Sequence, residues 1–329
     1  MKKIFILGSN SFSGNHLIGF LLKKKYKVYG CSQSNIYPQR FNSLSKMPTN
    51  KNFIFHRLDI NKNFDKLRRI ILKVKPDIII DFLGQGMVAE SWSYPELTFN
   101  SNLISKIKLY EILKNKKFLK KYIKISTPEV FGSANINKAN TFKYNPSTPY
   151  ALSHSSIETY LKLLKKEYNF PVIISRFANF YGPYQRLYRV IPLAIHKAFC
   201  KEKFYLHGGG KSRRSFIYSE DFCRGIYKMI LKGKIGEFYQ FSSKEYFSIK
   251  EVIEKIYLKF KLDPKNYIVN VKDRPGKDKD YKINDNDTRD KLKWKNEFNL
   301  NSGIDYVINW YLENNKKFNK KDTKFSIKT

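Results

Sequence analysis

The stretch that decides the fold is KIFILGSNSFSG, residues 3–14, close to the amino terminus. Its first part, Lys3–Leu7, is a short apolar run that stops at Gly8, which is typical of a buried parallel strand. Residues 15–22 then carry apolar side chains at helical spacing, and residues 27–31 form a second short apolar run. A strand, a glycine-containing turn, a helix and a second strand within about 30 residues is the order of the dinucleotide-binding βαβ unit.

The turn itself departs from the usual three-glycine pattern. Gly8 allows the tight turn and Gly14 allows close packing of the helix on the strand, but Ser11 stands where a second glycine is common. Ser11, Phe12 and Ser13 open the predicted helix, whose free N–H groups and positive dipole end suit a pyrophosphate. An ordinary turn between a strand and a helix is the alternative interpretation.

Strand and helix patterns continue to alternate along the chain. Further strands are predicted at 53–55, 77–82, 122–125 and 172–175, and helices at 67–74, 103–113 and 155–168. Repeated strand–helix units predict an α/β fold, a Rossmann-type doubly wound parallel sheet with helices on both faces.

Beyond residue 180 the alternation loosens, which predicts a smaller C-terminal substrate-binding lobe. We expect the dinucleotide-binding domain to span 1–180, with return segments near 216–245, around Phe216–Ile230 and Glu237–Phe241. The lobe would consist of 181–215 and 246–315. The basic tail, 316–329, is rich in Lys and Asn, and we expect it to be frayed.

The composition narrows the class of protein. The chain has 63 Lys and Arg against 28 Asp and Glu, a formal net charge of +35. Because the lysines are spread along the chain, a solvated surface is favoured over a nucleic-acid interface. The three cysteines are far apart, the five histidines show no metal-ligand spacing, and no apolar run reaches the roughly 20 residues of a membrane span. We therefore expect a cytoplasmic protein with no bound metal and no membrane or nucleic-acid partner.

Cofactor choice depends on the end of the second strand. NAD-binding proteins usually place a carboxylate there, whereas this chain has Ser32, Gln33 and Ser34, with Arg40 nearby. This favours NADP over NAD, since these groups suit a 2′-phosphate. Asp59 and Ile60, after the third strand, are expected at the adenine edge, with Asp59 as a helix cap the alternative.

Two further segments carry chemistry. KISTPEVFG, residues 124–132, follows an apolar strand and puts a hydroxyl and a carboxylate at its carboxyl end, where open α/β sheets bind ligands. PYALSH, residues 149–154, begins a helix and places Tyr150 and His154 on one face.

These motifs together resemble the extended short-chain dehydrogenase/reductases, specifically the nucleotide-sugar 4,6-dehydratases and epimerases. The resemblance covers residues 3–312. The motifs that carry it, in order, are GSNSFSGNHL, Asp59-Ile60, DFLGQGMVAESW with Asn102, ISTPEVFG, STPYALSH, SRFANFYGPYQ, GGGKSRRSFIYSEDF and DRPGKDKDY.

The resemblance implies specific catalytic roles. Thr127 would bond the sugar O4, and Tyr150 would take the O4 proton while C4 gives a hydride to the nicotinamide. Glu129 matches the base that removes the C5 proton. Return of the hydride to C6 then gives a 4-keto-6-deoxy sugar. Leu83, Tyr150 and His154 would contact the cofactor.

Two residues depart from the family pattern. Pro128 stands where the family has an acid, and a proline cannot donate a proton, so either Glu129 or a water would protonate the leaving C6 hydroxyl. His154 replaces the lysine of the YxxxK motif, and an ordinary histidine is mostly neutral at pH 7. An impaired homologue that binds NAD(P) without turnover is one alternative, and a 4-epimerase is another, since it needs no C5 base.

The resemblance also implies a site for the nucleotide diphosphate of the substrate. Asn179, Arg189, Arg214 and Arg274 match its binding positions, and arginine suits phosphate because its planar fork binds two oxygens. Sugar-facing positions in the loop after the fourth strand are Gln85, Ser91 and Trp92. The sequence does not decide between GDP, dTDP and UDP. We also expect a homodimer formed through helices 103–113 and 155–168.

Overall fold

The computed structural model describes residues 1–45, 47, 50–141, 143–273 and 280–325. Its centre is a seven-stranded sheet in the order β12-β7-β5-β4-β1-β2-β3, with every neighbouring pair parallel. The strands are β1 (Lys3–Leu7), β2 (Lys27–Ser32), β3 (Phe53–Arg57), β4 (Ile78–Asp81), β5 (Lys121–Ser126), β7 (Val172–Phe177) and β12 (Phe238–Phe241). The order reverses between β1 and β4, the place where doubly wound sheets bind ligands. The predicted fold class is confirmed.

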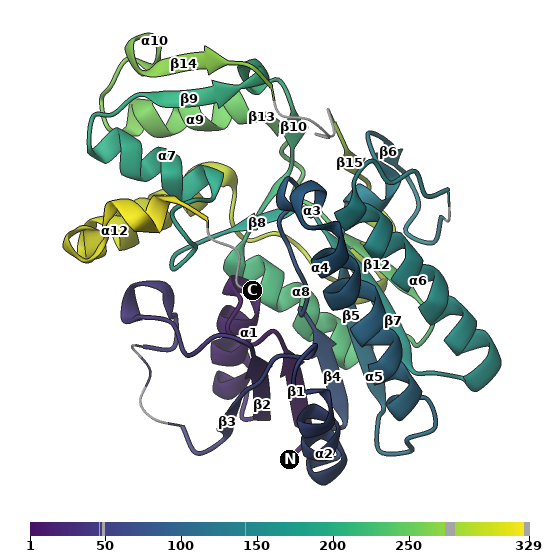
Figure 1. Ribbon diagram of the computed structural model, residues 1–329. Helices are drawn as coiled ribbons and strands as arrows, with labels where there is room; N and C mark the ends of the chain where they lie inside the picture. Colours follow the sequence, from purple (N-terminus) through teal and green to yellow (C-terminus); the bar gives the residue numbers. More distant parts are fainter. Residues whose placement is uncertain (46, 48–49, 142, 274–279, 326–329) are drawn as a thin grey trace.

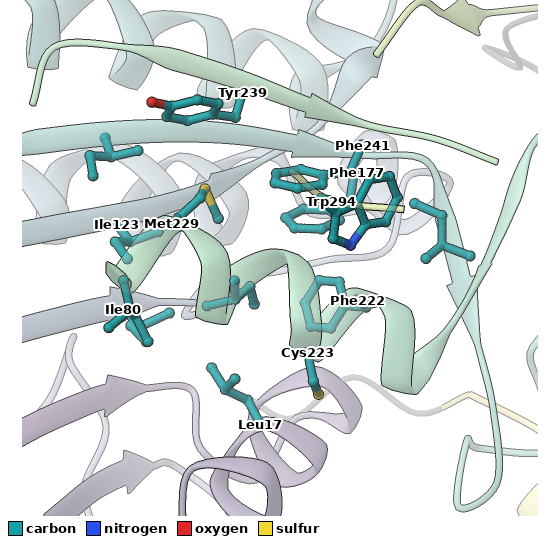
Figure 2. Close-up of a cluster of buried hydrophobic side chains, with 14 of the residues drawn as sticks. Leu17, Ile80, Ile123, Phe177, Phe222, Cys223, Met229, Tyr239, Phe241 and Trp294 are labelled. Atoms are coloured by element: carbon teal, nitrogen blue, oxygen red, sulfur yellow. The ribbon is translucent and has the colours of Figure 1, made fainter. Parts of the chain in front are cut away.

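Helices cover both faces of the sheet because its strands are apolar on both sides. Ile4 and Ile6 of β1 join one hydrophobic core, and Phe5 and Leu7 join the other. The first core lies under α1 (Phe12–Lys23), α8 (Ser219–Lys232) and α11 (Asn286–Leu292); the second lies under α2 (Phe64–Val74), α5 (Ser105–Leu113) and α6 (Pro149–Tyr168). Figure 2 shows the first core, where Phe222, Cys223 and Met229 of α8 lie between the sheet and Leu17 of α1.

Short elements connect the sheet to its helices. After β4 come α3 (Glu90–Ser93), α4 (Pro95–Phe99) and a π-helical turn (Asn100–Ile104) that leads into α5. A short 3-10 helix (Pro128–Phe131) follows β5, and β6 (Asn135–Ile136) pairs with β15 (Lys282–Ile283). Another 3-10 helix (Gln39–Phe41) follows β2.

The second, smaller lobe has its own core and lies toward the carboxyl ends of the strands (Figure 1). Its helices are α7 (Val190–Phe199), α9 (Ile249–Lys259), α10 (Pro264–Tyr267) and α12 (Leu300–Asn314). Its strands pair as β8 (Asn179–Tyr181) with β11 (Phe216–Tyr218), β9 (Phe204–His207) with β14 (Ile268–Val271), and β10 (Arg213–Arg214) with β13 (Phe247–Ser248); a 3-10 turn, Gly208–Gly210, follows β9.

Two sequence-based expectations differ from the structure. Of the return segments, β12 joins the large sheet and α8 packs on its face, whereas Phe216–Tyr218 forms β11 and pairs with β8 outside that sheet. The beginning of the tail is also ordered: it forms 3-10 turns at Asn315–Lys317 and Lys320–Thr323. The reason is tertiary, since Phe318 stacks on Tyr311 and Asp322 pairs with Arg40.

The helix that carries the catalytic candidates has a strong start signal. Thr148 is its N-cap, and its hydroxyl accepts a hydrogen bond from Ala151 N at 3.1 Å. Pro149 occupies the first turn, where its missing N–H is not needed. Among the described residues, no helix has the length and apolarity that crossing a membrane would require.

Candidate active site

The turn after β1 forms a cradle for a dinucleotide. Gly8 has a positive φ of 79°, and the Ser11 hydroxyl accepts a hydrogen bond from Gly14 N at 3.0 Å, capping α1. A Cβ on Gly14 would lie 2.6 Å from Gly8 O, so only glycine allows the helix to approach so closely. The first amides of a helix, here those of Phe12 and Ser13, have no partner within the helix and can bind a phosphate. These residues therefore fit a dinucleotide pyrophosphate.

The end of β2 uses its polar groups internally. Ser32 Oγ accepts a hydrogen bond from Asn10 N at 3.0 Å, and Arg40 forms an ion pair with Asp322 at 3.2 Å. A hollow of about 310 Å³ opens at Gln33, the residue after β2, and its other lining residues are Arg57, Leu58, Asp59, Lys62 and Asn63. Asp59 accepts a hydrogen bond from Asn61 N at 2.8 Å, which orders its own loop, and Ile60 is buried next to it.

Three candidate catalytic residues meet at the carboxyl end of β5. Thr127 is buried, caps the 3-10 helix 128–131 and accepts a hydrogen bond from Glu129 N at 3.3 Å. The Thr127 hydroxyl and the Glu129 carboxylate both lie close enough to the Tyr150 hydroxyl to change its pKa. Thr127 and Tyr150 are more than 20 residues apart in the sequence, and they come together because α6 packs over β5.

The electrostatic surroundings of Tyr150 set its proton affinity. Burial raises the pKa of Tyr150 above its ordinary value, and the nearby Glu129 carboxylate raises it further. The Thr127 hydroxyl and the positive charge of Arg189 lower the pKa of Tyr150 and so act in the opposite direction. Without further positive charge, the phenol therefore keeps its proton at neutral pH.

His154 follows Tyr150 by one helical turn. Its ring contacts that of Tyr150 with centroids 4.6 Å apart, and its Nδ1 lies 3.5 Å from Ser126 Oγ. Burial holds the pKa of His154 well below its ordinary value, and Lys124 and Lys106 lower it further. His154 is therefore a neutral imidazole at pH 7.

The loop after β4 is tied together by its own side chains. Leu83 N donates to Asp81 Oδ1 at 3.0 Å, and the Gln85 side chain exchanges hydrogen bonds with the backbone of Met87. Asn102 fixes this loop to α6 by donating to Gln85 O and to Ser153 Oγ, both at 3.1 Å.

Ser91 and Trp92 of α3, both predicted to face the sugar, differ in their exposure. Ser91 is fully buried and donates to Val88 O at 2.6 Å, so its hydroxyl is used within the loop. Trp92 is 54% exposed. It lines a second hollow, of about 270 Å³, together with Phe99, Pro146, Ser147, Thr148, Pro149 and Leu152.

Polar groups of the lobe converge on Tyr281. Its hydroxyl donates to Asn179 Oδ1 at 2.9 Å, and the Arg214 guanidinium lies over its ring, 4.2 Å from the centroid. Arg189 is exposed at the start of α7, and Arg274 lies outside the described residues. Tyr281 was not among the predicted site residues, although it is the last residue of the DRPGKDKDY motif.

A parallel sheet in this strand order, with a cradle after its first strand and a Thr–Tyr pair at its carboxyl edge, defines the extended short-chain dehydrogenase/reductase class. Within that class, the chain belongs to the GDP-mannose 4,6-dehydratase family, whose model matches residues 5–307.

Curated relatives cover nearly the whole chain. The dTDP-glucose 4,6-dehydratase of Haemophilus influenzae is 26% identical over 338 residues, which are 95% of this chain and 99% of that protein. The dTDP-glucose 4,6-dehydratase 1 of Escherichia coli K12 is 26% identical over 340 residues, 95% of this chain and 94% of the relative.

Solved structures agree with the fold over the same length. A dTDP-glucose 4,6-dehydratase of Bacillus anthracis in complex with NAD has a TM-score of 0.84 and 26% identity, covering 96% of this chain and 98% of that one. A UDP-glucuronic acid 4-epimerase of Bacillus cereus has a TM-score of 0.85 at 24% identity, and the match covers 94% of this chain and 99% of the epimerase. At that identity, the epimerase supports the fold alone.

Proposed function

We propose that this protein is a nucleotide-sugar 4,6-dehydratase that uses bound NAD(P). The observation that carries the proposal is the meeting of Thr127, Glu129 and Tyr150 at the carboxyl end of β5. The dTDP-glucose 4,6-dehydratases among its relatives support the same reaction. A hydroxyl, a carboxylate and a phenol in one site provide both the O4 and the C5 chemistry that dehydration requires.

The first step is removal of the O4 proton. Tyr150 takes this proton, and the nearby Thr127 hydroxyl orients the sugar O4. The residues of the turn after β1 would hold NAD(P), whose nicotinamide would supply the reversible hydride exchange that the reaction needs.

The second step is loss of water across C5 and C6. With a ketone at C4, the C5 hydrogen becomes acidic, and the Glu129 carboxylate removes it as a proton. The C6–O bond breaks, and the leaving hydroxide takes up a proton to give water. Pro128 is buried and has no proton to give, so Glu129 passes on the proton that it took from C5, directly or through a water.

Mass spectrometry on a panel of GDP-, dTDP- and UDP-hexoses tests the proposal. We expect loss of 18 mass units from one of them, because one water leaves per sugar. Glu129→Gln should reduce this rate by about 10²–10⁴-fold, the usual contribution of a positioned acid or base. Glu167→Gln, on the exposed end of α6, is the matched control and should leave the rate unchanged.

Pro128 favours one competing function, a 4-epimerase. An epimerase would change the hexose identity after hydrolysis without any mass change, and Glu129→Gln would not abolish its activity. Cofactor binding without either product would instead indicate a non-catalytic homologue.

We further propose NADP as the preferred cofactor. No carboxylate follows β2 directly, and Arg57 and Lys62 line the hollow beside Gln33. Arg40 is a weaker candidate for the 2′-phosphate than it was from sequence, because it pairs with Asp322. Fluorescence titrations should show tighter binding of NADPH than of NADH. Arg57→Ala should weaken the binding of NADPH and leave the binding of NADH unchanged. Tighter NADH binding, as the NAD in the B. anthracis enzyme suggests, would contradict this assignment.

We propose a nucleotide-sugar diphosphate site in the lobe and a homodimer through α5 and α6. Asn179, Tyr281 and Arg214 already meet there, and Arg189, at the start of α7, lies within electrostatic range of Tyr150. For the dimer, apolar side chains are exposed along α6 and immediately before α5; they are Leu152, Leu163 and Tyr168 on α6 and Ile104 before α5. Light scattering should give twice the chain mass, and Leu163→Glu should produce monomer whereas Leu231→Glu on α8 should not.

A further inference from the structure

Three charged side chains meet in the core beneath α6. Asp81 at the end of β4 and Lys106 of α5 are fully buried and form an ion pair, and Lys124 of β5 is 2% exposed. Lys124 Nζ lies 3.6 Å from Asp81 Oδ2, and the Tyr122 hydroxyl donates to the same oxygen at 2.8 Å. Two lysines against one carboxylate leave a formal excess of one positive charge.

A core position is an unfavourable place for such an excess. Lysine is almost never fully buried unless it is paired, and here one carboxylate serves two lysines. Burial lowers the pKa of Lys106 to about 8, so the Lys106 side chain is still mostly protonated at neutral pH. Its two lysine partners keep Asp81 ionised, with its pKa lowered to about 2 against the effect of burial.

The groups that face this cluster carry no compensating negative charge at neutral pH. They are Cys31 of β2, Tyr110 of α5, Tyr122 of β5 and His154 of α6. Burial raises the pKa of the Cys31 thiol to about 12, which keeps it protonated.

His154 connects the cluster to the site. It is within electrostatic range of Lys124 and Lys106, and its ring contacts that of Tyr150. Glu129 and Arg189 are the charged groups that act directly on Tyr150, and they oppose each other, so the cluster reaches Tyr150 only through His154.

We propose that Lys106 and Lys124 are positioning residues that supply, past a neutral His154, the positive charge that Tyr150 needs to release its proton. In the YxxxK motif a lysine at position 154 would carry this positive charge. Here the charge belongs to the buried Asp81–Lys106–Lys124 cluster next to His154. This inference rests on the proposed function only in taking Tyr150 as the proton acceptor. Neutral His154 is left with a ring nitrogen that can bond the nicotinamide ribose.

The central test is a cycle of His154→Lys, Lys124→Met and the double variant. His154→Lys alone adds a third cation to the cluster, and Lys124→Met alone removes the excess charge. Lys124→Met should slow cofactor reduction by about tenfold or more, as expected for the loss of a charge worth at least one pKa unit. His154→Lys should weaken NAD(P)H binding, measured by fluorescence, because the new cation replaces the ring proposed to face the ribose and is repelled by Lys106 and Lys124. The double variant should recover to near the wild-type values.

A pH profile separates this role from a merely structural one. In Lys124→Met, the pH at which cofactor reduction reaches half its maximum should rise by about one unit, the shift that corresponds to the tenfold loss of rate. Lys121→Met is the control on the same strand, because Lys121 bonds the carbonyls of Met229 and Ile230 instead.

A third readout needs neither sugar nor cofactor. The chain has five histidines, few enough for each imidazole to be followed by NMR, with His154 assigned from His154→Gln. In the wild-type protein the His154 signal should not titrate down to pH 5. In Lys124→Met, the midpoint pH of the His154 titration should rise. If Lys124→Met does not fold, Lys106→Met should show the same rise.

Additive losses in the cycle, or an ordinary His154 titration in the wild-type protein, would overturn the proposal. Since cofactor binding and the imidazole titration require no sugar, a failed dehydratase assay would refute the proposed function without affecting these two readouts.

Discussion

Two buried ionic clusters lie on the same face of the sheet and differ in their charge balance. Arg176 of β7 and Glu158 of α6 are both fully buried and form a one-to-one pair, with Arg176 Nε donating to Glu158 Oε1 at 3.0 Å. Tyr144 donates to the same carboxylate at 2.7 Å, and Arg176 donates to Ala139 O at 2.6 Å. The Asp81–Lys106–Lys124 cluster, under the same helix, has one cation too many.

The difference separates a structural role from a functional one. The Arg176 pair neutralises itself, so it exerts little field beyond its own bonds and holds α6 on the sheet. The unbalanced cluster projects positive charge toward His154, one ring away from Tyr150. Burial alone does not distinguish the two clusters; the count of charges does.

The largest expected effect comes from removing each carboxylate. Glu158→Gln leaves Arg176 unpaired, and Asp81→Asn leaves two lysines without their anion, so each should lower the free energy of unfolding by about 3–5 kcal/mol, with Asp81→Asn the worse. Urea unfolding followed by circular dichroism measures both. A loss for Asp81→Asn below that for Glu158→Gln would argue that the cluster is not the more strained of the two.

The next effect is a pH dependence that belongs to the unbalanced cluster alone. Because burial lowers the pKa of Lys106 from 10.5 to about 8, the folded state binds fewer protons than the unfolded state between these values. The free energy of unfolding should therefore rise with pH across this window, by roughly 2–3 kcal/mol relative to Lys106→Met. Unfolding of both proteins at pH 7.5 and pH 10 gives the difference, in which other titrating groups cancel. Parallel pH dependences would show that Lys106 is not perturbed.

A matched pair of tyrosines compares the clusters more finely. Tyr122→Phe removes a hydrogen bond to Asp81, and Tyr144→Phe removes one to Glu158. Each should cost about 1.5–2 kcal/mol of stability, as for hydrogen bonds to charged groups. Only Tyr122→Phe should also change NAD(P)H affinity, and an equal change in both variants would remove the functional distinction.

The smallest effect marks the value of an ion pair near the surface. Arg40 and Asp322, with side chains 23% and 9% exposed, tie the tail to the segment after β2. Arg40→Ala should cost only about 0.5–1 kcal/mol. NADPH affinity should stay unchanged, and a drop in it would return Arg40 to the 2′-phosphate site.

Much of the fold and part of the site could be predicted from local signals. The apolar runs that end at Gly8 and Asp81 predict strands because both faces of a parallel sheet are buried. Tyr150 and His154 could be paired because they are one helical turn apart. The segment 216–230 could not be placed, since apolar residues there serve equally in a strand or in an amphipathic helix.

The charged cluster and Tyr281 could not be predicted, because their roles depend on residues that are distant in the sequence. Lys106 and Lys124 were two lysines among many, in a chain whose surface is rich in them. A lysine inside the apolar strand 121–126 was the available signal, but its partner on β4 is distant in sequence. Tyr281 likewise gains its meaning only beside Asn179.

The sequence by itself determined the order of strands and helices, the dinucleotide turn and the identity of the residues at the end of β5, because each depends on neighbours within a few turns of chain. The tertiary structure alone decided which charges are buried together, that the tail packs on Arg40, and that burial and two buried lysines lower the pKa of His154 below that of an ordinary histidine. Charge interactions depend on distance and burial in three dimensions, and a residue's position in the sequence specifies neither.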